Sequence, residues 1–248
     1  MSTIYILWLR QIKRYLRSRS RLIGSLGQPL LFLVALGFGF GPVYQKAGEG
    51  SYVLFLVPGI VAMSILFTAM FSGIEIIWDR QFGFLKETMV APVPRLNIMI
   101  GRTLGGATVA TIQGLVVLIL ASLFGFHPVN WVMLPLAIIA MLLIALFFTG
   151  LGTAIASLLS DMQGFQLIMN FLIMPIFFLS GALFPLKGLP TILNIVVNLN
   201  PLAYGVDALR DSLIAQTYFG LGLDFTVMAL TSFIILAIGS YLFTKIQI

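Results

Sequence analysis

Residues 79–95 read DRQFGFLKETMVAPVPR, and they separate two long apolar stretches of the chain. This segment holds five charged side chains and two prolines, although only 9% of the whole chain is charged and 60% is hydrophobic. Apolar runs of ~20 residues are long enough to cross the hydrocarbon core of a bilayer. The sequence therefore predicts an all-α integral membrane protein in which this polar segment lies outside the membrane.

Six apolar segments meet the length criterion for a transmembrane helix. They account for most of the 248 residues, so we expect a single membrane domain over 1–248 without a separate soluble domain. The predicted spans are residues 22–42, 52–77, 98–126, 131–159, 164–184 and 223–244.

The lysines and arginines predict the orientation of these spans. If the N-terminus is cytoplasmic, eleven of the 14 fall in cytoplasmic segments and only Lys46, Lys187 and Arg210 fall outside. Positive charge is enriched on the cytoplasmic side of membrane proteins. We therefore predict a multi-pass protein of the cell membrane with both termini and residues 79–95 in the cytoplasm.

The first 21 residues form a basic and amphipathic segment. Arg10, Lys13, Arg14, Arg17 and Arg21 recur at intervals of three or four residues, which places them on one face of a helix. Such a helix is expected to lie in the membrane interface, where it binds anionic lipid. Contact with a cytoplasmic partner protein is a further option, whereas nucleic-acid binding is not needed to explain the charge.

Within the polar segment, residues 79–91 have the pattern of a short amphipathic helix. Trp78, Phe82, Leu85 and Met89 form one stripe, and Asp79 is placed to interact with the positive N-terminal end of that helix. Pro92 and Pro94 follow and would end the helix. A stiff helix of this kind suits contact with a soluble partner, and the alternative is an interfacial helix that has no partner.

Several motifs are absent from the sequence. No G-x-x-x-x-G-K-[ST] motif occurs, so the chain has no P-loop for ATP, and we expect it to bind no cofactor or metal. A single histidine, His127, and the lack of cysteine argue against metal and nucleophilic catalysis, so we expect no enzymatic activity. Glu75 is the most deeply placed carboxylate, and it is either paired with a nearby arginine, such as Arg80 or Arg102, or involved in gating.

Two stretches resemble one known family. WDRQFGFLKETMVAPVPRLNIMIGRTLGG (residues 78–106) is similar to the loop between the second and third spans of type-2 ATP-binding cassette (ABC) permeases. FLSGALFPLKGLPTILNIVVNLNPLAYGVDALR (residues 178–210) resembles the fifth-span exit and external segment of the same family. This family comprises the membrane subunits of drug, nodulation-factor and polysaccharide exporters.

The resemblance implies that 79–91 is a coupling helix that docks into a cleft of a separate cytoplasmic ABC ATPase subunit, which binds ATP and Mg²⁺. It also implies a second permease, identical or a close paralogue, across a two-fold axis. The residues then expected to contact the ATPase are Asp79, Arg80, Phe82, Gly83, Leu85 and Glu87, together with Arg10 and Arg14 of the N-terminal helix.

The family resemblance further implies that residues 185–210 form a re-entrant pair of short external helices, for which a surface cap and a seventh span are the alternatives. Four aromatic residues are candidates for the translocation path, or else they pack in the bundle or face lipid: Phe147, Phe171, Phe177 and Phe178. We expect a hydrophobic or amphipathic substrate such as a drug, a lipid or a lipid-linked glycan. The alternative function is a channel or secondary transporter that works without ATP.

Overall fold

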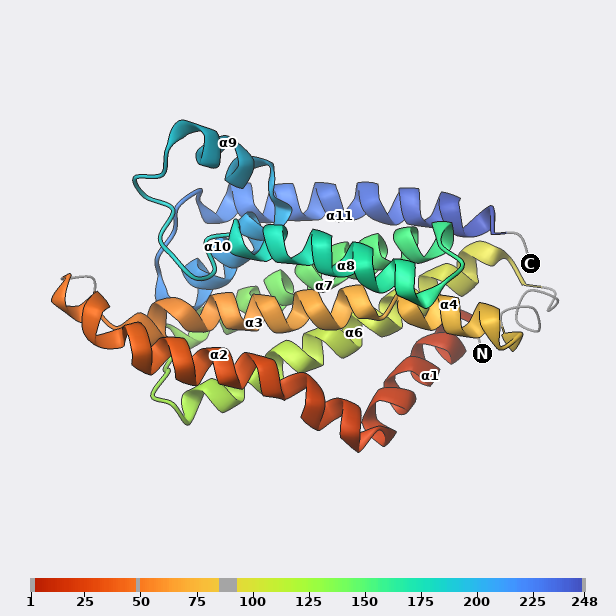
Figure 1. The fold of residues 1–248 in the computed structure, drawn as a ribbon, viewed down its shortest axis with the longest axis horizontal. Coiled ribbons are helices and arrows are strands. Elements are labelled where there is room, and N and C mark those ends of the chain that lie inside the picture. Colours follow the sequence, from red (N-terminus) through yellow and green to blue (C-terminus); the bar gives the residue numbers. More distant parts are fainter. Residues whose placement is uncertain (1–2, 48–49, 85–92, 247–248) are drawn as a thin grey trace.

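The computed structural model describes residues 3–47, 50–84 and 93–246, and this part of the chain is α-helical with no strand. Most of the helices lie side by side as a long bundle (Figure 1). The elements are α1 (Thr3–Arg17), α2 (Arg19–Lys46), α3 (Tyr52–Phe71), α4 (Ile74–Gln81), α6 (Arg95–Ser122), the 3₁₀ turn η1 (Trp131–Met133), α7 (Leu134–Leu158), α8 (Met162–Phe178), α9 (Thr191–Leu199), α10 (Pro201–Ile214) and α11 (Leu221–Thr244).

The predicted all-α membrane fold is confirmed. Within the described residues, five helical segments are long and apolar enough to cross a bilayer: Leu22–Lys46, Tyr52–Gln81, Arg95–Ser122, Trp131–Leu158 and Leu221–Thr244. They correspond to five of the six predicted spans, with ends that differ by up to four residues. The sixth, predicted over 164–184, is the 17-residue helix α8, which begins at Met162 and ends at Phe178.

A bent helix pair follows α8. Helices α9 and α10 meet at an angle of 84°, a geometry that fits either a broken span or a re-entrant loop. Asn200 lies at the bend, where its side-chain oxygen accepts a hydrogen bond from the amide of Leu202 at 3.0 Å. The same side chain donates to the carbonyl of Ile176 at 2.7 Å, so the bend is tied to the end of α8. The pair predicted over 185–210 therefore occupies 191–214.

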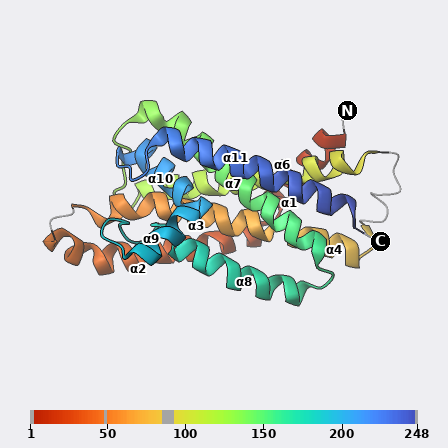
Figure 2. The same cartoon turned by 90° about the horizontal axis from the view of Figure 1, so that it is seen from above.

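Helix α3 runs through the centre of the bundle, and most of its side chains are buried. Glycines permit close approach at both of its ends. A Cβ atom on Gly59 would collide with the carbonyl of Ala182, and one on Gly73 would collide with the carbonyl of Gly152 on α7. Helix α8 lies in front of the other helices in Figure 1 and along one edge of the bundle in Figure 2.

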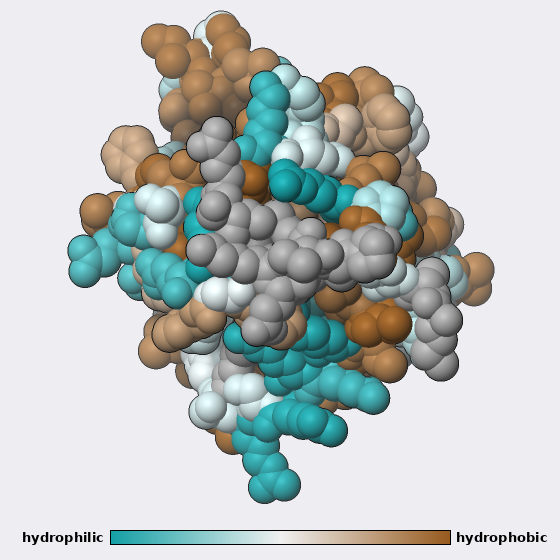
Figure 3. All heavy atoms as spheres, turned by 90° about the vertical axis from the view of Figure 1, so that its right-hand side faces the viewer, coloured by the Kyte–Doolittle hydropathy of each residue, from teal (hydrophilic) through white to brown (hydrophobic). Residues whose placement is uncertain are grey.

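The N-terminal helix, α4 and the end of α11 lie at the same end of the bundle, and α9 lies at the other (Figure 1). Hydrophilic side chains gather on the end that carries both termini (Figure 3). This arrangement agrees with the predicted topology, and the side of the membrane stays a prediction. The interface helix predicted over 1–21 is shorter, because α1 ends at Arg17 and α2 begins at Arg19.

Candidate functional site: a charge cluster between α1, α4 and α6

Helix α4 presents two carboxylates to the interior of the protein. It follows α3 after a turn at Ser72 and Gly73, and the amide of Gly73 donates to the carbonyl of Met70 at 3.1 Å. Glu75 and Asp79 are four residues apart and therefore lie on one face of the helix. Only 5% of Glu75 and 7% of Asp79 is exposed, so both carboxylates require partners.

Helix α1 docks along α6 through small residues. A Cβ atom on Gly101 would lie 2.8 Å from the carbonyl oxygen of Ile4, so any larger side chain at 101 would push α1 away. The indole of Trp8 donates to the hydroxyl of Thr108 at 3.0 Å. The hydroxyl of Tyr15, two turns further along α1, contacts the side-chain oxygen of Gln113. In these contacts, later residues of α1 meet later residues of α6, so the two helices run parallel.

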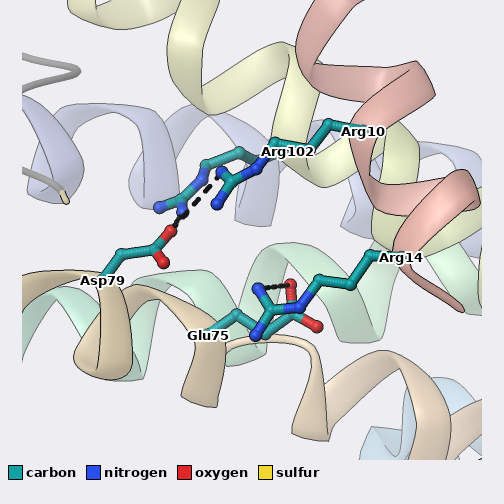
Figure 4. Close-up of polar contacts among 5 residues, drawn as sticks. All are labelled: Arg10, Arg14, Glu75, Asp79 and Arg102. Carbon is teal, nitrogen blue, oxygen red and sulfur yellow. Dashed lines mark ion pairs between the residues drawn. The ribbon is translucent and has the colours of Figure 1, made fainter. Parts of the chain in front are cut away.

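This docking brings three arginines to the two carboxylates of α4 (Figure 4). Arg14 pairs with Glu75 at 3.5 Å, and Arg10 pairs with Asp79 at 3.7 Å. Arg102 of α6 forms a second ion pair with Asp79. We call these five residues the charge cluster. It joins three helices that are far apart in sequence.

Three members of the charge cluster, Glu75, Asp79 and Arg102, are buried, whereas the side chains of Arg10 and Arg14 are 32% and 35% exposed. Arg102 is 6% exposed, like the carboxylate that it contacts. Burial lowers the pKa of the Arg10 guanidinium, the adjacent cation Arg14 lowers it further, and Glu75 opposes both effects. Removing one partner of a buried ion pair typically costs ~3–5 kcal/mol, a range that applies to the pair of Arg102 with Asp79, and the partly exposed arginines contribute less. The cluster should therefore hold α1, α4 and α6 together as one unit.

The C-terminal end of α4 is attached to a second part of the bundle. The guanidinium of Arg80 donates to the carbonyl of Leu159 at 3.0 Å, and the amide of Gln81 donates to the carbonyl of Ser160 at 3.4 Å. Both acceptors lie in the turn between α7 and α8. Asp161, in the same turn, caps α8 by accepting from the amide of Gly164 at 2.5 Å.

The predicted start of the coupling helix is wrong. Asp79 does not begin a helix, because α4 runs from Ile74 to Gln81 and Asp79 lies near its end, bound to two arginines. Phe82 is 79% exposed, and Gly83 has a φ of +79°, a left-handed conformation that turns the chain after α4. Leu85 and Glu87 lie outside the described residues, as does most of 79–91.

The partner expected for Glu75 also needs correction. Its ion pair is with Arg14, whereas Arg102 binds Asp79 and Arg80 binds a main-chain carbonyl. The signal was present in the sequence, because Arg10 and Arg14 have the same four-residue spacing as Glu75 and Asp79. The sequence alone, however, does not show that α1 docks on α6, so it could not indicate that these arginines pair with these carboxylates.

The four candidate path residues do not lie on one common surface of the chain, since two are buried and two are exposed. Phe147 is buried against Phe148, with ring centroids 4.8 Å apart. Phe177 is 1% exposed and packs edge-on against Phe32. In contrast, 85% of Phe171 and 45% of Phe178 is exposed, both on the outer side of α8.

Sequence analysis missed a group of buried charges at the other end of the bundle. Arg210 of α10 is 6% exposed and donates to the carbonyl of Gly181 at 2.9 Å. Asp207 accepts hydrogen bonds from the amides of Tyr218 and Phe219 at 2.8 and 2.7 Å. Asp224 is fully buried. In the described residues no three potential metal ligands of the His, Cys, Asp or Glu type come together.

Comparisons with known proteins agree on one family. The model of the family described as ABC-2 type transporter matches residues 2–214. Nodulation protein J of Rhizobium leguminosarum bv. trifolii is 31% identical over 208 residues, which cover 83% of this chain and 76% of that protein. The putative transport permease ycf38 of Cyanophora paradoxa is 27% identical over 261 aligned residues, covering 98% of this chain and 88% of the relative.

Proposed function

The chain belongs to the ABC-2 type transporter family, and from this membership we propose that it is the membrane subunit of an ATP-driven exporter. It is a multi-pass transport permease. Its energy comes from a separate ABC ATPase subunit that binds ATP and Mg²⁺ on the cytoplasmic side of the cell membrane. The N- and C-termini lie on that same side.

The observation that carries this proposal is the charge cluster. It fixes α4 to α1 and α6, and α4 is also the continuation of the central helix α3. A force applied to the segment after α4, where Phe82 is exposed, would reach α3, α6 and α1 together. Closure of the ATPase subunits on ATP would then tilt these helices, and hydrolysis would reset them by removing the ligand that favours closure.

The outer face of α8 supports a second permease beside this one. It exposes Gln166 and Asn170 together with the apolar side chains of Leu167 and Phe171. Side-chain amides are poorly accommodated by lipid tails, and in membranes they pair with groups on neighbouring helices. We therefore place a second copy, or a close paralogue, against α8. Phe171 and Phe178 then lie between the two permeases, on the path of the cargo.

The cargo is hydrophobic or amphipathic: a drug, a lipid or a lipid-linked glycan. The two exposed phenylalanines of α8 offer it apolar contacts, and the amides of Gln166 and Asn170 offer hydrogen bonds.

A charge exchange tests this coupling. We expect Arg14→Glu to place two carboxylates opposite each other, so that the assembled complex still hydrolyses ATP but no longer moves a fluorescent lipid, NBD-phosphatidylethanolamine, between the leaflets of proteoliposomes. The double variant Arg14→Glu with Glu75→Arg restores the ion pair in reverse and should recover transport.

The matched control is Arg17→Glu, which makes the same charge change at an exposed position of α1. It should leave transport unchanged. Equal loss in all three variants, or transport by the permease alone without an ATPase, would refute the coupling that we propose.

One observation favours the alternative, a secondary transporter. Asp224 is a buried carboxyl group in the first turn of α11, and it lies beside the carboxyl group of Asp207. Carboxyl groups in such positions can carry protons in ion-coupled transporters. If that were its role, Asp224→Asn would abolish transport driven by a pH gradient in the absence of ATP. We expect no such transport, even in the unmodified protein.

A further inference from the structure

A hollow lies at the end of the bundle opposite to the charge cluster. It has a volume of about 440 Å³ and is enclosed by the ends of α2 and α3, by α10, and by the two loops that flank the α9 and α10 pair. Pockets for small ligands are typically roughly 300–1,000 Å³. In the proposed orientation this hollow opens to the outside of the cell.

Arg210 is the buried charge of this hollow. Its Nη2 atom donates to the carbonyl of Gly181, and its guanidinium carbon lies 4.0 Å from the centre of the Phe55 ring. Its Nε atom, also buried, has no hydrogen-bond partner within the described chain. A guanidinium that is buried without a carboxylate contact keeps both its charge and its capacity to donate.

The nearby carboxylate does not neutralise Arg210 by contact. Asp207 lies one turn earlier on α10, but its oxygens accept from the hydroxyl of Thr217 and the amides of Tyr218 and Phe219 at 2.7–3.0 Å. No ion pair joins Asp207 to Arg210 in the part of the chain that the structure covers. The exposed Lys187 adds a second cation to the lining, which then holds two positive groups against one negative group.

We propose that this hollow binds an oxyanion, the phosphate or carboxylate of an amphiphilic molecule, between Arg210 and Lys187. Guanidinium groups match the geometry of phosphate and carboxylate. The rings of Tyr44 and Phe55 line the same hollow and would contact the apolar body that carries the oxyanion. The site requires neither nucleotide nor an ATPase, so it can be tested independently of the proposed function.

The test uses the full chain in dodecyl maltoside micelles, which contain no phosphate, titrated with inorganic phosphate at constant ionic strength and followed by ³¹P NMR line broadening. We expect saturable binding that Arg210→Gln abolishes and that Lys187→Gln weakens about tenfold, the loss of one charge-assisted contact. Lys187 is exposed, so its substitution leaves folding intact. Lys46→Gln, a charge change at the same end that does not line the hollow, should have no effect.

A second arm identifies the source of the oxyanion. Micelles that contain phosphatidylglycerol should compete with inorganic phosphate if a lipid headgroup occupies the site, and they should not compete if the ligand is soluble. Either outcome supports the site, provided that Lys187→Gln weakens binding. Absence of saturable phosphate binding, or equal binding by Lys187→Gln and Lys46→Gln, would overturn the proposal.

Discussion

Asp79 and Asp224 are both buried carboxylates, but their surroundings differ. Asp79 contacts two arginines, so its charge is compensated inside the protein. Asp224 is 0% exposed, and the group beside it is the carboxyl group of Asp207 rather than a basic side chain. An uncompensated buried carboxyl group costs folding free energy, whereas a neutral side chain of the same shape does not.

We therefore predict that Asp224→Asn stabilises the protein. Asparagine keeps the shape of the side chain and removes the buried carboxyl. The expected rise in the thermal midpoint is ~2–4 °C, which corresponds to about 1 kcal/mol for a chain of this size. The measurement is thermal unfolding of the purified protein in detergent.

Asp211→Asn is the matched control for this substitution, because Asp211 is a partly exposed carboxylate at the same end of the bundle. Its substitution should shift the midpoint by less. A lower midpoint for Asp224→Asn than for the unmodified protein would mean that the carboxyl group has a favourable partner.

At the scale of the elements, the position of α1 depends on its close approach to α6. The approach is possible because Gly101 and Gly105 leave no side chain between the two helices. It also carries Arg10 and Arg14 to α4. If α1 moved away from α6, the ion pairs of Arg10 and Arg14 with α4 should break, although none of the five residues of the charge cluster is substituted.

Gly101→Ala tests this dependence. The new Cβ atom would meet the main chain of Ile4, which cannot move unless α1 moves. Overpacking of this kind costs typically ~1–3 kcal/mol, and we expect trypsin to cleave α1 faster at its arginines and lysines. Gly39→Ala on α2 is the control, since nothing lies within 4 Å of the added atom. Equal cleavage rates in both variants would contradict the proposed docking of α1.

The helices themselves were predictable, but their junctions were not. Apolar length is a local property, so spans such as 98–126 and 223–244 could be placed to within about four residues of α6 and α11. The end of α4 at Gln81 depends on hydrogen bonds to the carbonyls of Leu159 and Ser160, almost eighty residues away in sequence. A local sequence pattern does not indicate contacts between such distant residues, so the sequence alone predicts Asp79 in the helix after α4 rather than in α4 itself.

At the level of the whole molecule, α8 buries only one narrow face, which consists of Phe165, Met169, Ile173 and Phe177. It is short, lies at the edge of the bundle, and exposes Phe171 to 85% (Figure 2). The chain contains no cysteine, so a single introduced thiol reports unambiguously on contact between copies. Phe171→Cys should form a disulfide-linked dimer in membranes on mild oxidation.

Phe233→Cys on α11 provides the comparison for this experiment. Phe233 is 73% exposed, but we expect it to face lipid rather than a second permease. It should remain monomeric on oxidation. Dimers from Phe233→Cys and none from Phe171→Cys would place the second copy against α11 instead.

The central claim is that a separate ATPase moves α4 and α1 as one body. The most direct measurement is of distances between spin labels in a complex of this chain with the proposed ATPase. A label at Gln81→Cys alone reports the separation of the two copies, and a pair at Arg17→Cys and Gln81→Cys reports the separation of α1 from α4. We predict that a non-hydrolysable ATP analogue changes the first distance and leaves the second unchanged. An unchanged distance between copies, or a change between α1 and α4 within one copy, would contradict the account.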